Sequence, residues 1–539
     1  MDKKKLLENK NKIIVGVLVL IIITTGLYMF SMGSVKDDDP RHICVALHNN
    51  IPEPESGFNP LTGWGCGHQN YNTLAYSTLF KTSENGTMDN DLATDYSISS
   101  DGLVWTVNIR DDVIFSDNST LDAEDVAFSF NTAKKTHAEL DLTNLENAKA
   151  VDNNTIEFHL VKPRSTFIYD LRYVGIVSKE NYNNESPIGS GPYVLKQWDK
   201  GQQAIFEINN NYYGKKPYFT QITLLFPEES SWIELAKSGE ADIIPIPING
   251  LNETVDGYDK LSLPAGRAQG VSLPYVQDNG TKTKDGNAVG NNVTSDIAIR
   301  KALNIGINRS EIVEAVYSGY GAPEYTSVDS RAFGNPNAIV KDADPDEAKR
   351  ILEEAGWVDS DGDGIREKNG TKASFQLYYP SDYLDRQSLS VAFSEHVKDL
   401  GIEVKLVGTD WDTIYANMYN SAALMQQTSP DPYKSVYQQY HSKPLDDNYM
   451  NPNWYNNSKV DSLLDEAMSM TDLEGSNRVW AESAFYGDGG YGPAGDAPWV
   501  WIATYKYTYF VNKDLNIDQG RPDNLGNDIF INVCEWTRN

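Results

Sequence analysis

The segment from Asp91 to Phe130 constrains the fold of this chain more than any other part of the sequence. Between Leu103 and Ile109, apolar residues alternate with more polar ones, which is the period of a β-strand with one buried face. A short polar loop follows, and Asp122 then stands at the position of a helix N-cap, ahead of an apolar stripe. The pattern predicts a half-buried strand, a loop and a helix, and it needs no catalytic group.

Length and charge narrow the class of protein. At 539 residues the chain is too long for one simple core, so two or three domains are expected. Its 76 acidic and 46 basic residues give a formal net charge of -30. Binding to nucleic acid needs clustered Lys and Arg, so the composition argues against a nucleic-acid partner.

Five further blocks follow one another in an order that resembles the family 5 solute-binding proteins, which deliver peptides, nickel chelates or similar solutes to ABC importers. The segment Asp91–Phe130 resembles the signature of that family. The later blocks are Pro187–Tyr193, Asn211–Pro217, Leu235–Ile243, Asp296–Arg309 and Asp344–Trp357. In the last two, apolar residues at helical spacing predict helices, the second of which ends at Gly356.

The resemblance implies an α/β, two-lobed periplasmic-binding-protein-like fold of the large type, with an extra subdomain in lobe I and one apolar helix at the N-terminus. The polar run 278–292 predicts a connecting loop, and the aromatic and β-branched segment Tyr505–Val511 predicts a returning strand. Both predictions fit this plan. The expected divisions are lobe I at 40–80, 188–275 and 499–539, the inserted subdomain at 81–187, and lobe II at 276–498.

The N-terminal segment, residues 1–39, indicates export. Several lysines precede an apolar run at 13–30, and three aspartates follow it, which places the bulk of the chain outside the membrane. The run is either a membrane anchor or part of a signal peptide cleaved near Gly33. The expected location is therefore the extracytoplasmic face of the cell membrane or the medium.

Enzymatic functions find little support in the sequence. The chain contains no GxSxG, HExxH or P-loop motif, and its many carboxylate pairs are typical of a solvated acidic surface. A secreted glycoside hydrolase and a surface receptor remain the distant alternatives. We expect a monomeric binding protein that requires no cofactor and whose partners are a small solute and an ABC permease.

Two hypotheses about the identity of the solute stay open. Peptide-binding relatives hold the ligand's α-amino group with an aspartate, and Thr428 stands at the matching position here. A hydroxyl cannot supply the negative charge of a charge-assisted hydrogen bond to an ammonium group. This departure disfavours oligopeptides and dipeptides, so a nickel chelate or a related small solute is preferred.

Several residues match the nickel branch of the family. The resemblance implies that Arg172 holds chelator carboxylates and that His441 completes the coordination of nickel, which arrives as part of the ligand. A surface ion pair for the arginine and ordinary packing for the histidine are the alternatives. The ligand-binding residues expected from the resemblance are Trp64, His68, Arg172, Thr428, His441, Trp499 and Trp501.

One local motif resembles a calcium loop. Asp359, Asp361 and Asp363 match the first three oxygen ligands of an EF-hand, and Gly364 follows them at the sharp turn. Gly370 stands where the bidentate glutamate belongs. The motif therefore predicts at most a weak calcium site, and an acidic surface turn is the alternative.

Overall fold

The structure is a computed structural model of the whole chain. It describes residues 39–48, 53–54, 57–62, 72–82, 88–136, 140–329, 331–427, 429, 431–442, 451–517 and 529–539. The apolar run at 13–30, the cleavage site near Gly33, and the predicted ligand residues Trp64, His68 and Thr428 lie outside these ranges. Within the described residues, no helix is both long enough and apolar enough to cross a membrane.

A four-stranded antiparallel sheet forms a subdomain of its own, in the order β4-β5-β7-β6. Every second residue of β5 is buried in the same core cluster as the apolar residues of α3, as the sequence alternation predicts. Asp122 Oδ1 accepts a hydrogen bond from the Glu124 amide at 2.9 Å, which confirms the predicted N-cap. The elements are β4 (Ala93–Ile98), β5 (Val104–Ile109), α3 (Ala123–Thr136), β6 (Leu145–Ala150), β7 (Thr155–Leu160) and α4 (Phe167–Tyr173).

An eleven-stranded mixed sheet runs through the rest of the molecule in the order β17-β16-β18-β12-β19-β11-β1-β10-β9-β8, with β13 paired to β19. Its strands are β1 (His42–Ala46), β8 (Tyr193–Asp199), β9 (Gln203–Ile208), β10 (Gln221–Leu225), β11 (Ile243–Pro245), β12 (Tyr258–Ser272), β13 (Gly321–Pro323), β16 (Ser374–Pro380), β17 (Glu403–Thr409), β18 (Ala422–Gln427) and β19 (Trp499–Asn512).

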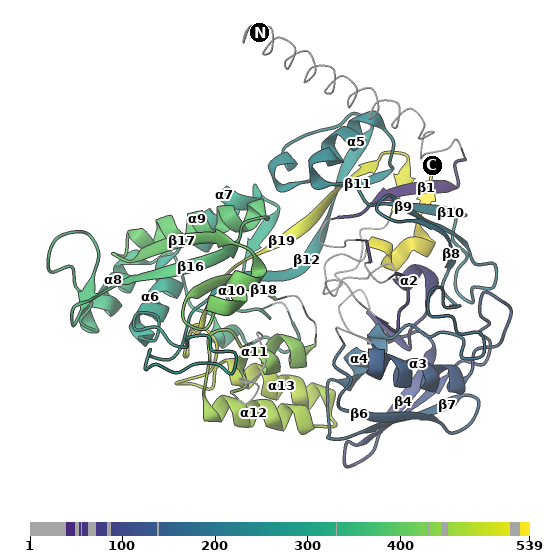
Figure 1. Cartoon of the computed structure of the whole chain (residues 1–539), viewed down its shortest axis with the longest axis horizontal. Helices are drawn as coiled ribbons and strands as arrows, with labels where there is room; N and C mark the ends of the chain where they lie inside the picture. The colour runs from purple at the N-terminus through teal and green to yellow at the C-terminus, as the bar shows by residue number, and fades with distance from the viewer. Residues whose placement is uncertain are drawn as a thin grey trace, which may run out of the picture.

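Two long antiparallel strands, β12 and β19, join the two lobes (Figure 1). The first lobe holds the parallel strands β1, β10 and β11, and the second holds the parallel strands β16, β17 and β18. The predicted strand Tyr505–Val511 is confirmed as part of β19. The polar run 278–292 contains no named strand or helix, only an isolated bridge between Lys282 and Ala288.

Helices cover the sheet of the second lobe. Asp296 caps α6 and Asp344 caps α8, both within the blocks that predicted helices. Among the described residues, the α-helices outside the subdomain are α2 (Asn72–Ala75), α5 (Trp232–Ser238), α6 (Ile297–Gly306), α7 (Arg309–Tyr317), α8 (Pro345–Glu354), α9 (Leu384–Lys398), α10 (Trp411–Asn417), α11 (Gln438–Tyr440), α12 (Ser458–Ser469) and α13 (Leu473–Ala484), and short 3-10 or π segments lie at Glu229–Ser231, Ile248–Gly250, Pro336–Ala338, Tyr433–Tyr437 and Ile529–Glu535.

The apolar core is divided in the same way as the sheet. One large buried cluster joins the first lobe to the four-stranded subdomain, whereas two others lie on the α6–α9 side and the α12–α13 side of the second lobe. Three short two-stranded ribbons complete the strands of the described residues: β2 (Phe80–Thr82) with β3 (Met88–Asn90), β14 (Glu367–Lys368) with β15 (Thr371–Lys372), and β20 (Leu515–Asn516) with β21 (Thr537–Arg538). The residue boundaries predicted for the lobes stay predictions.

Candidate binding site between the lobes

The carboxyl ends of parallel strands from both lobes meet at one crevice. In the first lobe, His48 follows β1 and residues 246–248 follow β11. In the second lobe, residues 382–386 follow β16 and lead into α9. In open α/β sheets, ligands bind outside the carboxyl ends of the strands, so this crevice is the expected place for a solute.

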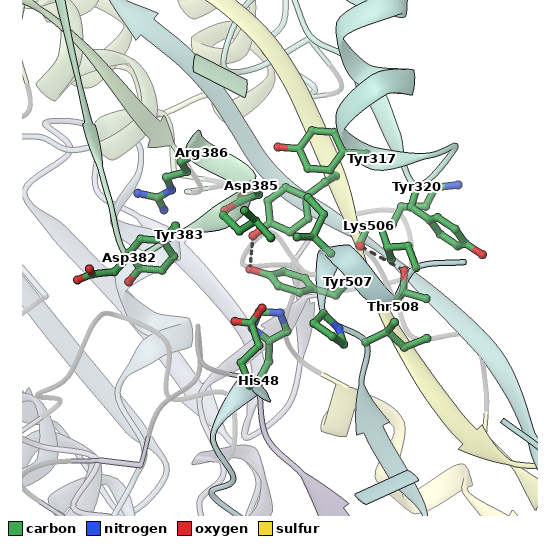
Figure 2. A pocket seen from close by; sticks show the side chains of 17 residues that line it. His48, Tyr317, Tyr320, Asp382, Tyr383, Asp385, Arg386, Lys506, Tyr507 and Thr508 are labelled. Atoms are coloured by element: carbon green, nitrogen blue, oxygen red, sulfur yellow. Dashed lines mark hydrogen bonds between the residues drawn. The ribbon is translucent and has the colours of Figure 1, made fainter. Parts of the chain in front are cut away.

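A pocket of about 260 Å³ occupies this part of the crevice (Figure 2). Its lining combines five tyrosines with six acidic or basic side chains. Its volume lies just below the range of about 300–1,000 Å³ that is usual for small-molecule sites. The aromatic and ionisable lining residues are Tyr317, Tyr320, Tyr383, Tyr505, Tyr507, His48, Glu229, Asp382, Asp385, Arg386 and Lys506.

Arg386 is the most informative side chain in this pocket. It is buried, and its guanidinium lies over the rings of Tyr383 and Trp411, 4.6 and 5.2 Å from their centroids. Its Nη2 donates to Gln426 Oε1 at 2.7 Å, whereas its buried Nη1 has no hydrogen-bond partner among the described residues. A buried donor left in this state is costly, and a carboxylate oxygen is the group that would best satisfy it.

His48 contributes an imidazole from the other lobe. Its ring packs against Trp232 and Tyr507, with centroid distances of 5.0 and 4.9 Å. Burial, assisted by the charge of Arg267, lowers the pKa of His48 from 6.5 to about 3. The imidazole is therefore neutral at physiological pH, which is the state in which histidine binds metals.

Two tyrosines that line the pocket belong to β19, which together with β12 joins the lobes; we call β12 and β19 the hinge strands. The hydroxyl of Tyr505 donates to that of Tyr507 at 3.1 Å, and the Tyr505 ring stacks on Tyr317 of α7 with centroids 5.6 Å apart. The amide of Gln269 on β12 donates to Asp385 Oδ2 at 3.1 Å. The pocket walls are thus connected directly to the two strands that join the lobes.

The predicted carboxylate anchor, Arg172, lies elsewhere. It is buried on α4 of the four-stranded subdomain, where it donates to the hydroxyl of Tyr173 at 2.9 Å. The guanidinium carbon is 4.6 Å from the centroid of the same ring. Arg172 does not line the pocket, and its role in holding a solute stays a prediction.

The predicted aromatic residues Trp499 and Trp501 belong to the core of the second lobe. Both are buried, and their rings stack with centroids 4.4 Å apart. The indole nitrogen of Trp501 donates to the hydroxyl of Tyr440 at 3.3 Å. Neither residue lines the pocket, so their contact with solute also stays a prediction.

His441, the predicted nickel ligand, is fully buried behind α12. Its ring stacks on Tyr437 at 4.5 Å, and its Nε2 lies 3.2 Å from Asp465 Oδ1. Its Nδ1 is 3.9 Å from Asp461 Oδ1. Both ring nitrogens therefore lie near carboxylates of the second lobe. The role of His441 in nickel binding stays a prediction.

The three aspartates of the calcium-like loop do converge. Asp359, Asp361 and Asp363 are exposed, and each offers an oxygen within 4.8 Å of the others. Lys372 pairs with Asp361 at 3.3 Å and also with Asp363, so an ammonium group already neutralises part of the cluster. The side-chain hydrogen bond from Lys372 lowers the pKa of Asp363. The arrangement is compatible with a weak calcium site and with an acidic surface turn, so the calcium site stays a prediction.

The pocket residues His48, Asp385 and Arg386 were not predicted. A signal was present, because each follows a strand of alternating or continuous apolar residues, at the end where α/β proteins bind ligands. The sequence does not show that strands more than 300 residues apart end at the same crevice. That information comes only from the order of strands in the sheet.

Comparisons with known proteins agree with this architecture. A family model described as bacterial extracellular solute-binding proteins, family 5, middle part, matches residues 87–461. The oligopeptide-binding protein AppA of Bacillus subtilis (strain 168) is 27% identical over 452 residues, which cover 78% of this chain and 80% of that protein.

A second relative has a different stated ligand. The nickel-binding periplasmic protein of Escherichia coli (strain K12) is 27% identical over 368 residues, covering 64% of this chain and 67% of that protein. Among solved structures, NikZ from Campylobacter jejuni in complex with Ni(L-His) superposes with a TM-score of 0.75 at 23% identity. The match covers 93% of this chain and 100% of that one, and it establishes the shared fold.

Proposed function

The chain belongs to the bacterial extracellular solute-binding proteins of family 5, and we propose that it captures a small solute bearing a carboxylate, preferably a nickel chelate, in the crevice pocket. Proteins of this family serve ABC transporters. Closure of the two lobes around the solute would give the form presented to the permease.

The observation that carries this proposal is Arg386. Its buried Nη1 lacks a partner among the described residues, and it lines a pocket to which both lobes contribute. A carboxylate of the solute would pair with it through a charge-assisted hydrogen bond. We therefore propose Arg386 as the carboxylate anchor, whereas the role expected for Arg172 from the sequence stays a prediction.

The preference for a nickel chelate rests on His48. A neutral imidazole in the same pocket is suited to Ni²⁺, and the surrounding tyrosines offer flat surfaces for a chelator. A single imidazole is not a complete site, so the metal would arrive already wrapped by a small chelator. The nickel-binding relative supports this choice.

Calorimetry with a defined probe tests the proposal. Ni²⁺ with two equivalents of L-histidine is titrated into the wild type and into His48→Gln and Arg386→Met variants. Each substitution is expected to weaken binding about tenfold or more, because a direct ligand contact is lost. His441→Gln and Arg172→Met are the matched controls, since they change the same residue types outside the pocket.

The controls also show whether the solute is held by the pocket residues or by the residues expected from the family resemblance. If His441→Gln and Arg172→Met weaken binding while His48→Gln and Arg386→Met do not, the solute is held by the residues expected from the family. Unchanged binding in all four variants would show that neither set of residues holds the chelate, and absence of binding to the wild type would remove the nickel chelate as the ligand.

A peptide ligand is the second candidate, favoured by the carboxylates of the same pocket. Asp382, Asp385 and Glu229 line it and would attract an α-ammonium group, while Arg386 would take the C-terminal carboxylate. The oligopeptide-binding relative supports this alternative. Because Thr428 replaces the amine-binding aspartate, we expect simple dipeptides to bind weakly, losing on the order of 1.5–3 kcal/mol. Submicromolar affinity for a dipeptide such as Ala-Ala would reverse the preference.

Location, assembly and the lack of turnover complete the proposal. We expect a monomer on the outer face of the membrane, anchored by residues 13–30 or released after cleavage near Gly33. Mass spectrometry of the N-terminus distinguishes the two forms. Recovery of the nickel probe chemically unchanged after prolonged incubation would agree with a binding protein that has no catalytic activity.

A further inference from the structure

The two lobes also meet at the end of the crevice remote from β12 and β19. There the loop 161–166 and α4 of the four-stranded subdomain lie against the second lobe, at residues 431–434 and at the α12–α13 corner. Figure 1 shows α12 and α13 beside this subdomain, below the hinge strands. We call the contact of residues 164–173 with residues 431–434 and 467–476 the remote contact.

A buried ion pair lies at its centre. Arg164 Nη1 is 2.8 Å from Asp170 Oδ2 within the subdomain, and its Nη2 is 3.4 Å from Asp431 Oδ2 in the second lobe. All three side chains are at most 3% exposed. The guanidinium also lies 4.3 Å from the centroid of the Tyr433 ring, whose hydroxyl donates to Asp141 Oδ2 at 3.0 Å.

Asp431 has two separate tasks. Its Oδ1 accepts the amide of Tyr433 at 2.9 Å, so it orders the turn of its own lobe. Its Oδ2 is left to face Arg164 of the other lobe. One oxygen therefore serves the local fold and the other serves the contact between lobes.

Backbone and hydroxyl groups extend the remote contact. The amide of Ser165 donates to Met468 O at 2.8 Å, and its hydroxyl donates to Ala467 O at 2.8 Å. Ser476 adds a hydrogen bond to the Ser165 hydroxyl at 3.0 Å. Ser165 and Ser476 are both 2% exposed, so the contact excludes water rather than merely touching at the surface.

We propose that Arg164 and Asp431 form a latch that holds the crevice shut, so that they set the affinity for solute without touching it. Neither residue lines the pocket. When the lobes separate, the Arg164–Asp170 pair stays within the subdomain, whereas the bond to Asp431 and the three bonds of the Ser165 group must break. The latch rests on closure of the lobes, but not on the identity of the solute.

Hydrogen exchange of the Ser165 amide in solute-free protein tests the latch. The Asp431→Asn variant keeps the oxygen that orders the turn and replaces the oxygen that faces Arg164. The Ser165 amide is expected to exchange about tenfold faster in this variant than in the wild type, because the lobes open more often. The control is Asp410→Asn, because Asp410 caps α10 of the second lobe, is exposed, and forms its side-chain hydrogen bonds within its own segment.

Wild-type exchange of Ser165 in Asp431→Asn would overturn the latch, as would equally fast exchange in Asp410→Asn. Should Asp431→Asn fail to fold, Tyr433→Phe removes only the hydroxyl bonded to Asp141 across the contact, and it is expected to accelerate Ser165 about threefold. Unchanged exchange there would overturn the proposal too. Because no solute is present, failure of the latch and failure of the proposed solute are separate results.

Discussion

At the hinge, the crevice is crossed by the unbroken backbones of β12 and β19, whereas at the remote contact the lobes meet through side chains and a few backbone groups. The pocket beside these two strands is lined by stacked tyrosines and by a histidine that burial keeps neutral. The remote contact is built around a buried arginine between two aspartates. The covalent link keeps the lobes together, and the ionic contact decides how far apart they stand.

Removing the charge at the remote contact should have the largest effect on stability. Arg164→Met leaves Asp170 and Asp431 buried without their counter-ion, and the free energy of unfolding should fall by about 3–5 kcal/mol. Arg110→Met removes the exposed pair with Asp112 in the same subdomain and should cost less than about 1 kcal/mol. Urea denaturation measures both. Equal losses would mean that burial does not distinguish the two ion pairs.

The hinge should respond to acid through His48. Its pKa of about 3 lies below the unfolded value of 6.5, so the associated stability is present above pH 6.5 and is lost as pH falls toward 3. By pH 5 the loss amounts to about 2 kcal/mol. His48→Phe should remove this component, so its free energy of unfolding should decline less between pH 7 and pH 5. A slope identical to that of the wild type would show that His48 is not buried in solution.

The remote contact should instead respond near neutral pH. Burial raises the pKa of Asp170 to about 7, opposed by Arg164 and Lys434 and reinforced by Asp431 and Asp141. Separation of the lobes exposes Asp170 and lowers this pKa, so closure is favoured at low pH and is lost as pH rises through 7. The ratio of closed to open solute-free protein should therefore fall as pH rises from 6 to 8.

Scattering and Ser165 protection, corrected for intrinsic exchange, report this change. Asp170→Asn removes the titrating group and keeps Arg164 and Asp431, so its closed fraction should not vary with pH over this range. The same decline in Asp170→Asn as in the wild type would assign the titration to another group.

Calcium should have the smallest effect, because its candidate loop lies outside both ends of the crevice. Lys372 already occupies part of the aspartate cluster, and Gly370 supplies no side-chain oxygen. At 1 mM calcium we expect the melting temperature to rise by about 1 °C or less. Asp361→Asn should remove even that shift in differential scanning fluorimetry. A rise of several degrees would show a real site.

Local elements of the fold were predictable, whereas the pocket was not. The alternation around Trp105 gives β5, and Asp122, Asp296 and Asp344 mark helix starts, because each signal lies within a few neighbouring residues. Arg386 comes after strand β16, at the end of the sheet where ligands bind, but no neighbouring residues mark it as a binding residue. Its importance depends on a missing hydrogen-bond partner, which only the three-dimensional packing defines.

The same reasoning explains why the sequence predicts His441 as a ligand-binding residue and does not predict His48. His441 stands near a family motif in the sequence, yet its ring is enclosed by Tyr437 and α12. His48 follows a strand without any motif around it, and it lines the pocket because β1 lies in the middle of the first lobe's parallel strands. Resemblance identifies the family and its cleft, whereas the residues at the cleft of one member are set by packing.

The register of β12 has a mechanical consequence. Its ladder with β19 shifts between Pro264 and Ala268 and again between Gln269 and Gly270, in the middle of the span between the lobes. Such irregularities increase local twist and bend a strand pair without ending it. The two register shifts form one bent line across an otherwise continuous sheet, and we expect the lobes to rotate about that line. A motion with one axis has one coordinate, so one distance between the lobes would describe the whole cycle from empty to loaded protein.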